Sequence, residues 1–242
     1  MRSFLYVPLL VLVFAGPALA ASIVVPSGSE FVEGGGDTPF PFNAGISQRY
    51  QQVYDASEFT SFGLPVVISE ITFRPDAGFF GSAFSTTITS IQINLSTTSS
   101  GPDALSMTFA SNVGADDTVV FSGALSLSSA DTGPGGGPKD FDIVITLQTT
   151  FLFDPTAGDL LLDVRNFSGE DTTQFDAVFA ADTTSRTFST SGGVNAVTAD
   201  DFDSIGLVTK FTVTPIPEPR SALLFAAGAL VVGVALRKKA VA

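Results

Sequence analysis

The sequence contains no histidine, no cysteine and no tryptophan among its 242 residues. Without histidine or cysteine there is no imidazole base and no thiolate nucleophile, which excludes Ser-His-Asp and Cys-His catalysis. The same absences exclude disulfides, iron–sulfur clusters and ordinary zinc sites. They do not fix the compartment, because a domain of about 200 residues buries enough surface to fold without disulfides.

Basic residues are scarce. Residues 21–216 carry 6 Lys and Arg against 23 Asp and Glu, a net charge of −17, together with 20 of the 23 phenylalanines. Nucleic acid and anionic lipid headgroups are therefore excluded as partners, because both need a basic patch on the protein. A span that is acidic and rich in Phe at once is not disordered by composition, and its length fits one all-β domain.

Helix-stabilising pairs of Glu and Lys are almost absent from this span, whereas alternating strand patterns recur. Within 88–95, for example, Ile91, Ile93 and Leu95 share one face, whereas Gln92 and Asn94 share the other. Similar patterns predict strands at 66–73, 105–109, 121–127, 141–147 (with Phe141 pointing inward), 160–164, 177–180 and 207–213. With no βαβ rhythm, they predict an all-β domain over residues 21–214. We expect an antiparallel β-sandwich of the jelly-roll type, with a barrel as the alternative.

Glycine and proline mark the predicted connections. Residues 131–138 are expected to form a flexible loop, and 34–37 a loose N-terminal arm. The Phe side chains are expected to fill the core, with Phe79-Phe80 in a loop folded back on the sandwich. The only amphipathic rings of the domain are Tyr50 and Tyr54.

The first 20 residues have the three parts of a secretory signal peptide. Arg2 is the positive part, residues 4–15 are apolar, and Ala18-Leu19-Ala20 is a small-x-small cleavage signal. We expect signal peptidase and the secretion machinery to process this segment, so that the mature chain begins near Ala21. The alternative is an uncleaved N-terminal anchor.

Residues 215–239 also have three parts, which are Pro217-Glu218-Pro219, a charge-free apolar stretch at 221–236, and the basic cluster Arg237-Lys238-Lys239. The apolar stretch predicts a transmembrane helix of about 24 Å at ~1.5 Å per residue, slightly shorter than the hydrocarbon core. The basic cluster would stay in the cytoplasm, leaving residues 21–220 exported. The alternatives are a simple membrane anchor or a buried core helix.

This order of parts, with a signal peptide at the other end, resembles the PEP-CTERM sorting signal. The resemblance implies processing near Pro217–Pro219 by an exosortase of a Gram-negative bacterium that makes exopolysaccharide. It implies anchoring in the inner membrane first, then delivery to the cell surface or extracellular matrix. Residues 240–242 depart from the pattern by trailing the basic cluster. Segments at 49–54, 95–98, 109–116 and 153–164 also resemble PEP-CTERM ectodomains, which implies one continuous domain and no catalytic residues.

No cofactor is predicted, but the acidic residues allow calcium, because clustered Asp side chains and loop carbonyls can supply its six to eight oxygen ligands. Two loops gather side-chain oxygens within a short turn, one through Asn112, Asp116 and Asp117, and the other through Asp154, Asp159 and Asp163. The alternative for each loop is solvated turn carboxylates that cap backbone amides.

No residue pattern predicts an enzyme. Pairs of carboxylates at glycosidase spacing arise by chance among 23 acids, so a glycoside hydrolase is only the second alternative. We expect a non-catalytic, structural or adhesive protein of the cell surface or biofilm matrix. The first alternative is a carbohydrate-binding, lectin-like module assisted by calcium. Fold class does not decide between them.

Overall fold

The structure is a computed structural model that describes residues 19–42, 45–62, 65–78, 81–179 and 182–216. Within these ranges the chain is mostly β-strand, with three short 3-10 helices, η1 (Ala56–Phe62), η2 (Phe109–Ser111) and η3 (Gly193–Asn195). All pairs of strands there are antiparallel. The prediction of an all-β domain with antiparallel sheets is confirmed.

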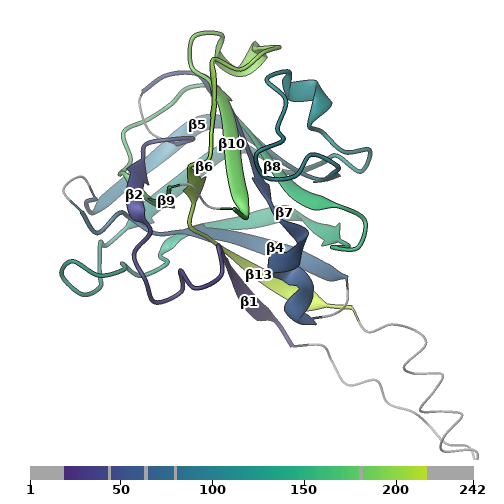
Figure 1. Cartoon of the computed structure of the whole chain (residues 1–242). Helices are drawn as coiled ribbons and strands as arrows, with labels where there is room; N and C mark the ends of the chain where they lie inside the picture. The colour runs from purple at the N-terminus through teal and green to yellow at the C-terminus, as the bar shows by residue number, and fades with distance from the viewer. Residues whose placement is uncertain (1–18, 43–44, 63–64, 79–80, 180–181, 217–242) are drawn as a thin grey trace, which may run out of the picture. The chain divides into compact units, whose positions relative to one another are not determined.

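The described strands form three sheets (Figure 1). The first has the order β1 (Ala21–Val25), β13 (Thr209–Pro215), β4 (Val66–Phe73), β7 (Ile143–Phe153). The second has the order β11 (Asp201–Asp203), β10 (Thr184–Ser189), β3 (Gln48–Tyr54), β8 (Asp159–Asn166), β5 (Phe84–Thr98), β6 (Thr118–Ser129). The third is small, with the order β12 (Gly206–Leu207), β9 (Phe175–Val178), β2 (Gly35–Thr38).

One hydrophobic core takes side chains from both larger sheets. Ile71 and Phe211 come from the first sheet, and Ile93 and Leu162 come from the second. The rings of Phe211 and Tyr54 meet edge to face across this core, with centroids 5.1 Å apart. Both sheets therefore bury one face against shared apolar side chains, which explains the alternating pattern of their strands.

A glutamine side chain ties the edge strands of the two larger sheets together. Gln148 lies on β7, and its Nε2 donates to the carbonyl of Ser122 on β6 at 3.2 Å. The Ser122 amide donates to Oε1 of the same glutamine at 3.1 Å. The side-chain amide thus takes the place of a backbone partner and satisfies both polar groups of an edge residue.

Most of the predicted strands are present, and β4 has the predicted bounds. The segment 105–109 is a correction, because it forms no strand and Phe109 begins η2. Leu105 and Phe109 are buried, as the alternation indicated, but Met107 between them is 41% exposed. The side chain of Asn112, however, accepts from the Ser106 amide and donates to the Ser106 carbonyl, so both backbone groups are already paired.

The predicted loose arm at 34–37 is also a correction, since Gly35–Thr38 is strand β2 and pairs with β9. The pattern missed it because the strand has no apolar side chain. Strand β3 was missed for a related reason. All seven of its residues are buried although four of them are Gln or Arg, and Arg49 and Gln51 are paired with Asp163 on the neighbouring strand β8.

Candidate functional site

Each residue of the first predicted calcium loop has a different hydrogen-bond partner within the protein. Asn112 is buried, and its Nδ2 donates to Oε1 of Gln51 at 2.9 Å. Asp116 accepts from the Thr97 amide at 2.7 Å, and Asp117 accepts from Nδ2 of Asn94. Each polar group thus has its own local partner, and a calcium site here stays a prediction.

The second predicted loop is divided in a similar way. Asp154 accepts from the amide and hydroxyl of Thr156 within its own turn. Asp159 accepts from the Ala56 amide at 2.7 Å, and burial raises its pKa. Asp163 is buried and forms an ion pair with Arg49, with 2.6 Å between Oδ2 and Nη2. The prediction of calcium at these residues stays untested.

The described residues bring together a different set of carboxylates, Glu33, Asp76 and Asp176, which we call the acidic cluster. One oxygen of each lies within 4.8 Å of the others. Glu33 immediately precedes Gly34, whose amide donates to Oδ1 of Asp176 on β9. Residues distant in sequence meet here because β2 and the end of β4 both lie against β9.

The buried side chain of Arg74 binds both a carboxylate of the acidic cluster and the backbone beside it. It follows β4 and is among the largest fully buried side chains of the described residues. Its Nε donates to Oδ2 of Asp176 at 2.7 Å, and its Nη2 donates to the Val32 carbonyl at 2.7 Å. Its Nη1 donates to the Glu30 carbonyl at 3.4 Å. A buried guanidinium thus compensates one carboxylate and fixes the backbone at residues 30–32.

The acidic cluster holds more negative charge than Arg74 can compensate. Burial raises the pKa of Asp76 to about 6, and the negative charge of Glu33 adds to the rise. The hydrogen bond from the Gly78 amide lowers the pKa and offsets part of this effect. Burial also raises the pKa of Asp176, although Arg74 acts in the opposite direction. Oε2 of Glu33 is buried and has no hydrogen-bond donor among the described residues. A proton or a cation in the cluster would lower its electrostatic cost.

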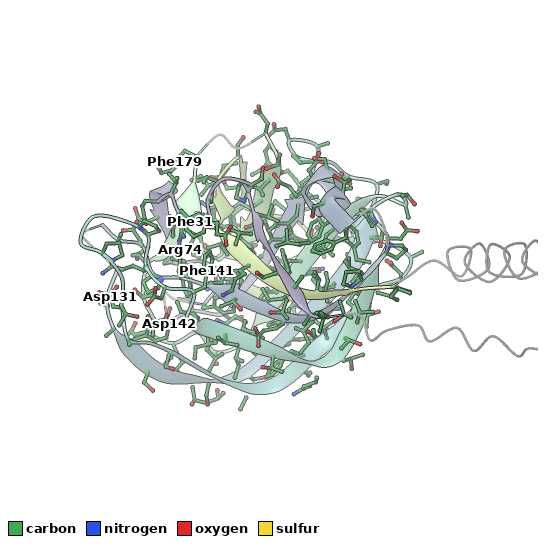
Figure 2. All side chains as sticks on the ribbon, turned by 90° about the horizontal axis from the view of Figure 1, so that it is seen from below. Phe31, Arg74, Asp131, Phe141, Asp142 and Phe179 are labelled. Atoms are coloured by element: carbon green, nitrogen blue, oxygen red, sulfur yellow. The ribbon has the colours of Figure 1, made fainter. Side chains whose placement is uncertain are left out.

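Two hollows open near the acidic cluster and near Phe141, whose ring Arg74 contacts; Figure 2 labels Arg74, Phe31 and Phe141. The acidic hollow has a volume of about 380 Å³, and Glu33, Asp37, Asp76 and several glycines line it. The second, which we call the Phe31 groove, has a volume of about 490 Å³. Its lining includes Phe31, Phe141 and Lys210, and the loop at 134–141 forms one of its walls.

The exposure of several aromatic side chains differs from the expectation. Tyr50 and Tyr54 are fully buried, so neither offers a ring to a ligand. Phe31 instead is 79% exposed. Phe141 precedes β7 and is only half-buried, which corrects the prediction that it points into the core. The guanidinium of Arg74 lies 4.8 Å from its ring centroid, and Nζ of Lys210 lies 5.0 Å from it.

The sequence patterns did not identify the groove as a candidate site, nor the residues Arg74, Glu33, Asp76 and Asp176. One signal was available, because Arg74 is one of only six basic residues in the span 21–216 and directly follows a predicted strand. Its carboxylate partner could not be named, because Asp176 lies 102 positions further along the chain.

The two terminal segments, which resemble a signal peptide and the PEP-CTERM sorting signal, lie almost entirely outside the described residues. Residues 1–18 contain most of the predicted signal peptide, including Ala18, while Ala20 lies just inside the described part. Residues 217–242 contain Pro217, Glu218, Pro219, the predicted helix and Arg237, Lys238 and Lys239. Among the residues that the structure describes, no helix is long and apolar enough to span a membrane. Comparison of the chain with protein-family models and with curated proteins gives no match.

Proposed function

We propose that this chain is an exported, exosortase-sorted protein of the PEP-CTERM type, with a non-catalytic structural or adhesive role at the cell surface or in the exopolysaccharide matrix. Signal peptidase would remove residues 1–20. The C-terminal segment would hold the chain in the inner membrane until an exosortase processes it near Pro217–Pro219.

The positions of the first and last strands support this proposal most directly. Strand β1 begins at Ala21, the residue after the predicted signal-peptide cleavage site. Strand β13 ends at Pro215, two residues before the sorting motif. The two strands pair with each other, with Ala21 opposite Val213. Processing at both predicted sites would therefore release the domain with all of its described strands intact.

The architecture of the domain supports a structural role. Two antiparallel sheets that share one core fit the β-sandwich of the jelly-roll type that we propose for residues 21–214. Arg49, Arg74 and Arg186 each form an ion pair with an aspartate inside this framework. Half of the domain's basic residues therefore serve the fold.

The sorting motif is tested by the double variant Pro217→Ala, Pro219→Ala in a bacterium that carries an exosortase. We expect the variant to insert in the membrane but to remain unprocessed, because the extended segment that the enzyme grips would be lost. The matched control is Pro134→Ala, Pro138→Ala in the 131–138 loop. Intact-mass analysis of the released protein gives the readout. Processing of the motif variant at the wild-type rate would reject the proposal.

Calcium binding is tested by thermal unfolding. A specific site would raise the melting temperature more with millimolar calcium than with sodium at the same ionic strength, whereas screening alone would act equally. The variants Asp116→Asn, Asp154→Asn and Asp76→Asn assign any specific effect to the first predicted loop, the second predicted loop or the acidic cluster. Identical curves in the two salts would show that none of these carboxylates forms a specific calcium site.

A further inference from the structure

The Phe31 groove presents an aromatic ring that the fold holds in solvent. Phe31 is 79% exposed, more than the exposed rings of Phe179 and Phe167, so its face is open to a ligand. The backbone on both sides of Phe31 is nevertheless fixed, because buried Arg74 donates to the carbonyls of Glu30 and Val32. Arg74, one of the few basic residues of the domain, thus fixes the backbone that carries the exposed ring of Phe31.

The same cation positions the second ring of the groove. The guanidinium of Arg74 lies 4.8 Å from the centroid of Phe141, and Figure 2 shows Phe31, Arg74 and Phe141 on the same side of the domain. Phe31 and Phe141 both line the groove. Arg74 therefore links the two rings, and a surface arranged before binding loses less entropy when a ligand arrives.

The polar lining offers hydrogen-bond donors and acceptors together. Lys139 and Lys210 line the groove, and they are two of the three basic residues of the domain outside the buried arginine–aspartate pairs. Lys139 is held by Asp131, with 3.3 Å between Nζ and Oδ2. Glu30 and Asp140 contribute exposed carboxylates to the same lining.

This chemistry selects the class of ligand. The two carboxylates of the lining and the net charge of −17 on the domain oppose a polyanion. The two lysines oppose a cation, and four charged side chains make the groove unsuitable for a purely apolar ligand. A neutral polyhydroxylated chain fits, because its hydroxyls bind both carboxylates and ammonium groups, and the C–H faces of its sugar rings pack on aromatic rings.

We propose that the Phe31 groove binds a neutral polysaccharide chain, with Phe31 as the stacking ring and Lys210 and Asp140 as partners of the sugar hydroxyls. The inference rests on the proposed function in the exopolysaccharide matrix, and it names the surface of the domain that would contact the matrix.

The test is a carbohydrate array that carries neutral glucans, mannans and galactans beside alginate and hyaluronate, probed with the full-length chain in detergent. We expect binding to at least one neutral polysaccharide. Phe31→Ala should weaken it by about tenfold or more, because truncation of an aromatic anchor has effects of this size. Phe31→Trp should retain binding. The control Phe167→Ala removes an exposed ring that does not line the groove.

Three outcomes would overturn the inference. They are binding to the anionic polysaccharides alone, no binding to any polysaccharide, and neutral binding that is unchanged by Phe31→Ala. Processing at the sorting motif is measured in parallel on Phe31→Ala and should match the wild type. Loss of wild-type sorting would reject the proposed function without bearing on the array, so the two failures are distinguishable.

Discussion

Asp76 makes the stability of the domain depend on pH. Burial raises its pKa from 3.8 to about 6, so the folded state holds the proton more tightly than the unfolded chain does. The stability from this group is complete below pH 3.8 and is lost as the pH rises through about 6. At ~1.4 kcal/mol per pKa unit the whole shift corresponds to ~3 kcal/mol. Because Asp76 lines an open hollow, solvent screening should reduce the measurable effect to ~1–2 kcal/mol.

The variant Asp76→Asn tests this reasoning, because the amide oxygen can still accept from the Gly78 amide but the group no longer titrates. Urea unfolding of wild type and variant across the range from about pH 3.5 to 7.5, at about 0.15 M salt, gives the free energy of unfolding. We expect nearly equal stability at the acidic end. At the neutral end the variant should be more stable by ~1–2 kcal/mol, as the linkage above requires.

The matched control is Asp171→Asn, which changes an exposed carboxylate outside both hollows and should leave the pH profile unaltered. A difference between Asp76→Asn and wild type that stays constant with pH would show that folding does not raise the pKa of Asp76. So would a variant that is less stable at neutral pH, because Asp76 would then be a favourable charge in the folded state.

The remaining predictions concern packing and hydrogen bonds, and urea unfolding measures each of them. Arg74→Leu should destabilise the domain by ~3–5 kcal/mol, because it leaves the buried Asp176 without its ion-pair partner. Adding Asp176→Leu should restore part of the lost stability. A cost of Arg74→Leu below ~1 kcal/mol would contradict the prediction. Gly36→Ala should cost ~0.5–1.5 kcal/mol, because a Cβ there would lie 2.6 Å from the exposed ring of Phe179, which must leave its rotamer to make room. In a Phe179→Ala background the cost should disappear, and an unchanged cost would place the strain elsewhere. Gln148→Ala should cost ~0.5–1.5 kcal/mol by leaving edge-strand groups unpaired, and an effect near zero would show that water replaces the side chain.

Several features of the fold could be predicted because they depend on local patterns. Alternation over 91–95 identified part of β5, since side chains on a strand point to opposite faces. Apolar residues at all positions of 160–164 except Asp163 identified a strand buried on both faces, as β8 is. Glycine and proline at 131–138 identified a loop, since the residues there form no strand or helix.

Residue type and local spacing were enough to predict the all-β class, most strand positions and the excluded chemistries, because these features arise within short stretches of chain. The partners of buried polar groups depend instead on which distant strands pair, and short stretches of chain do not specify that. The sequence of strand β3 is polar, and its Arg49 and Gln51 can be buried only because Asp163 on β8 lies beside them and accepts their hydrogen bonds. Likewise, Asp176 meets Arg74 only because distant strands pair, and hydrophobic patterns carry no information about which charge will compensate another.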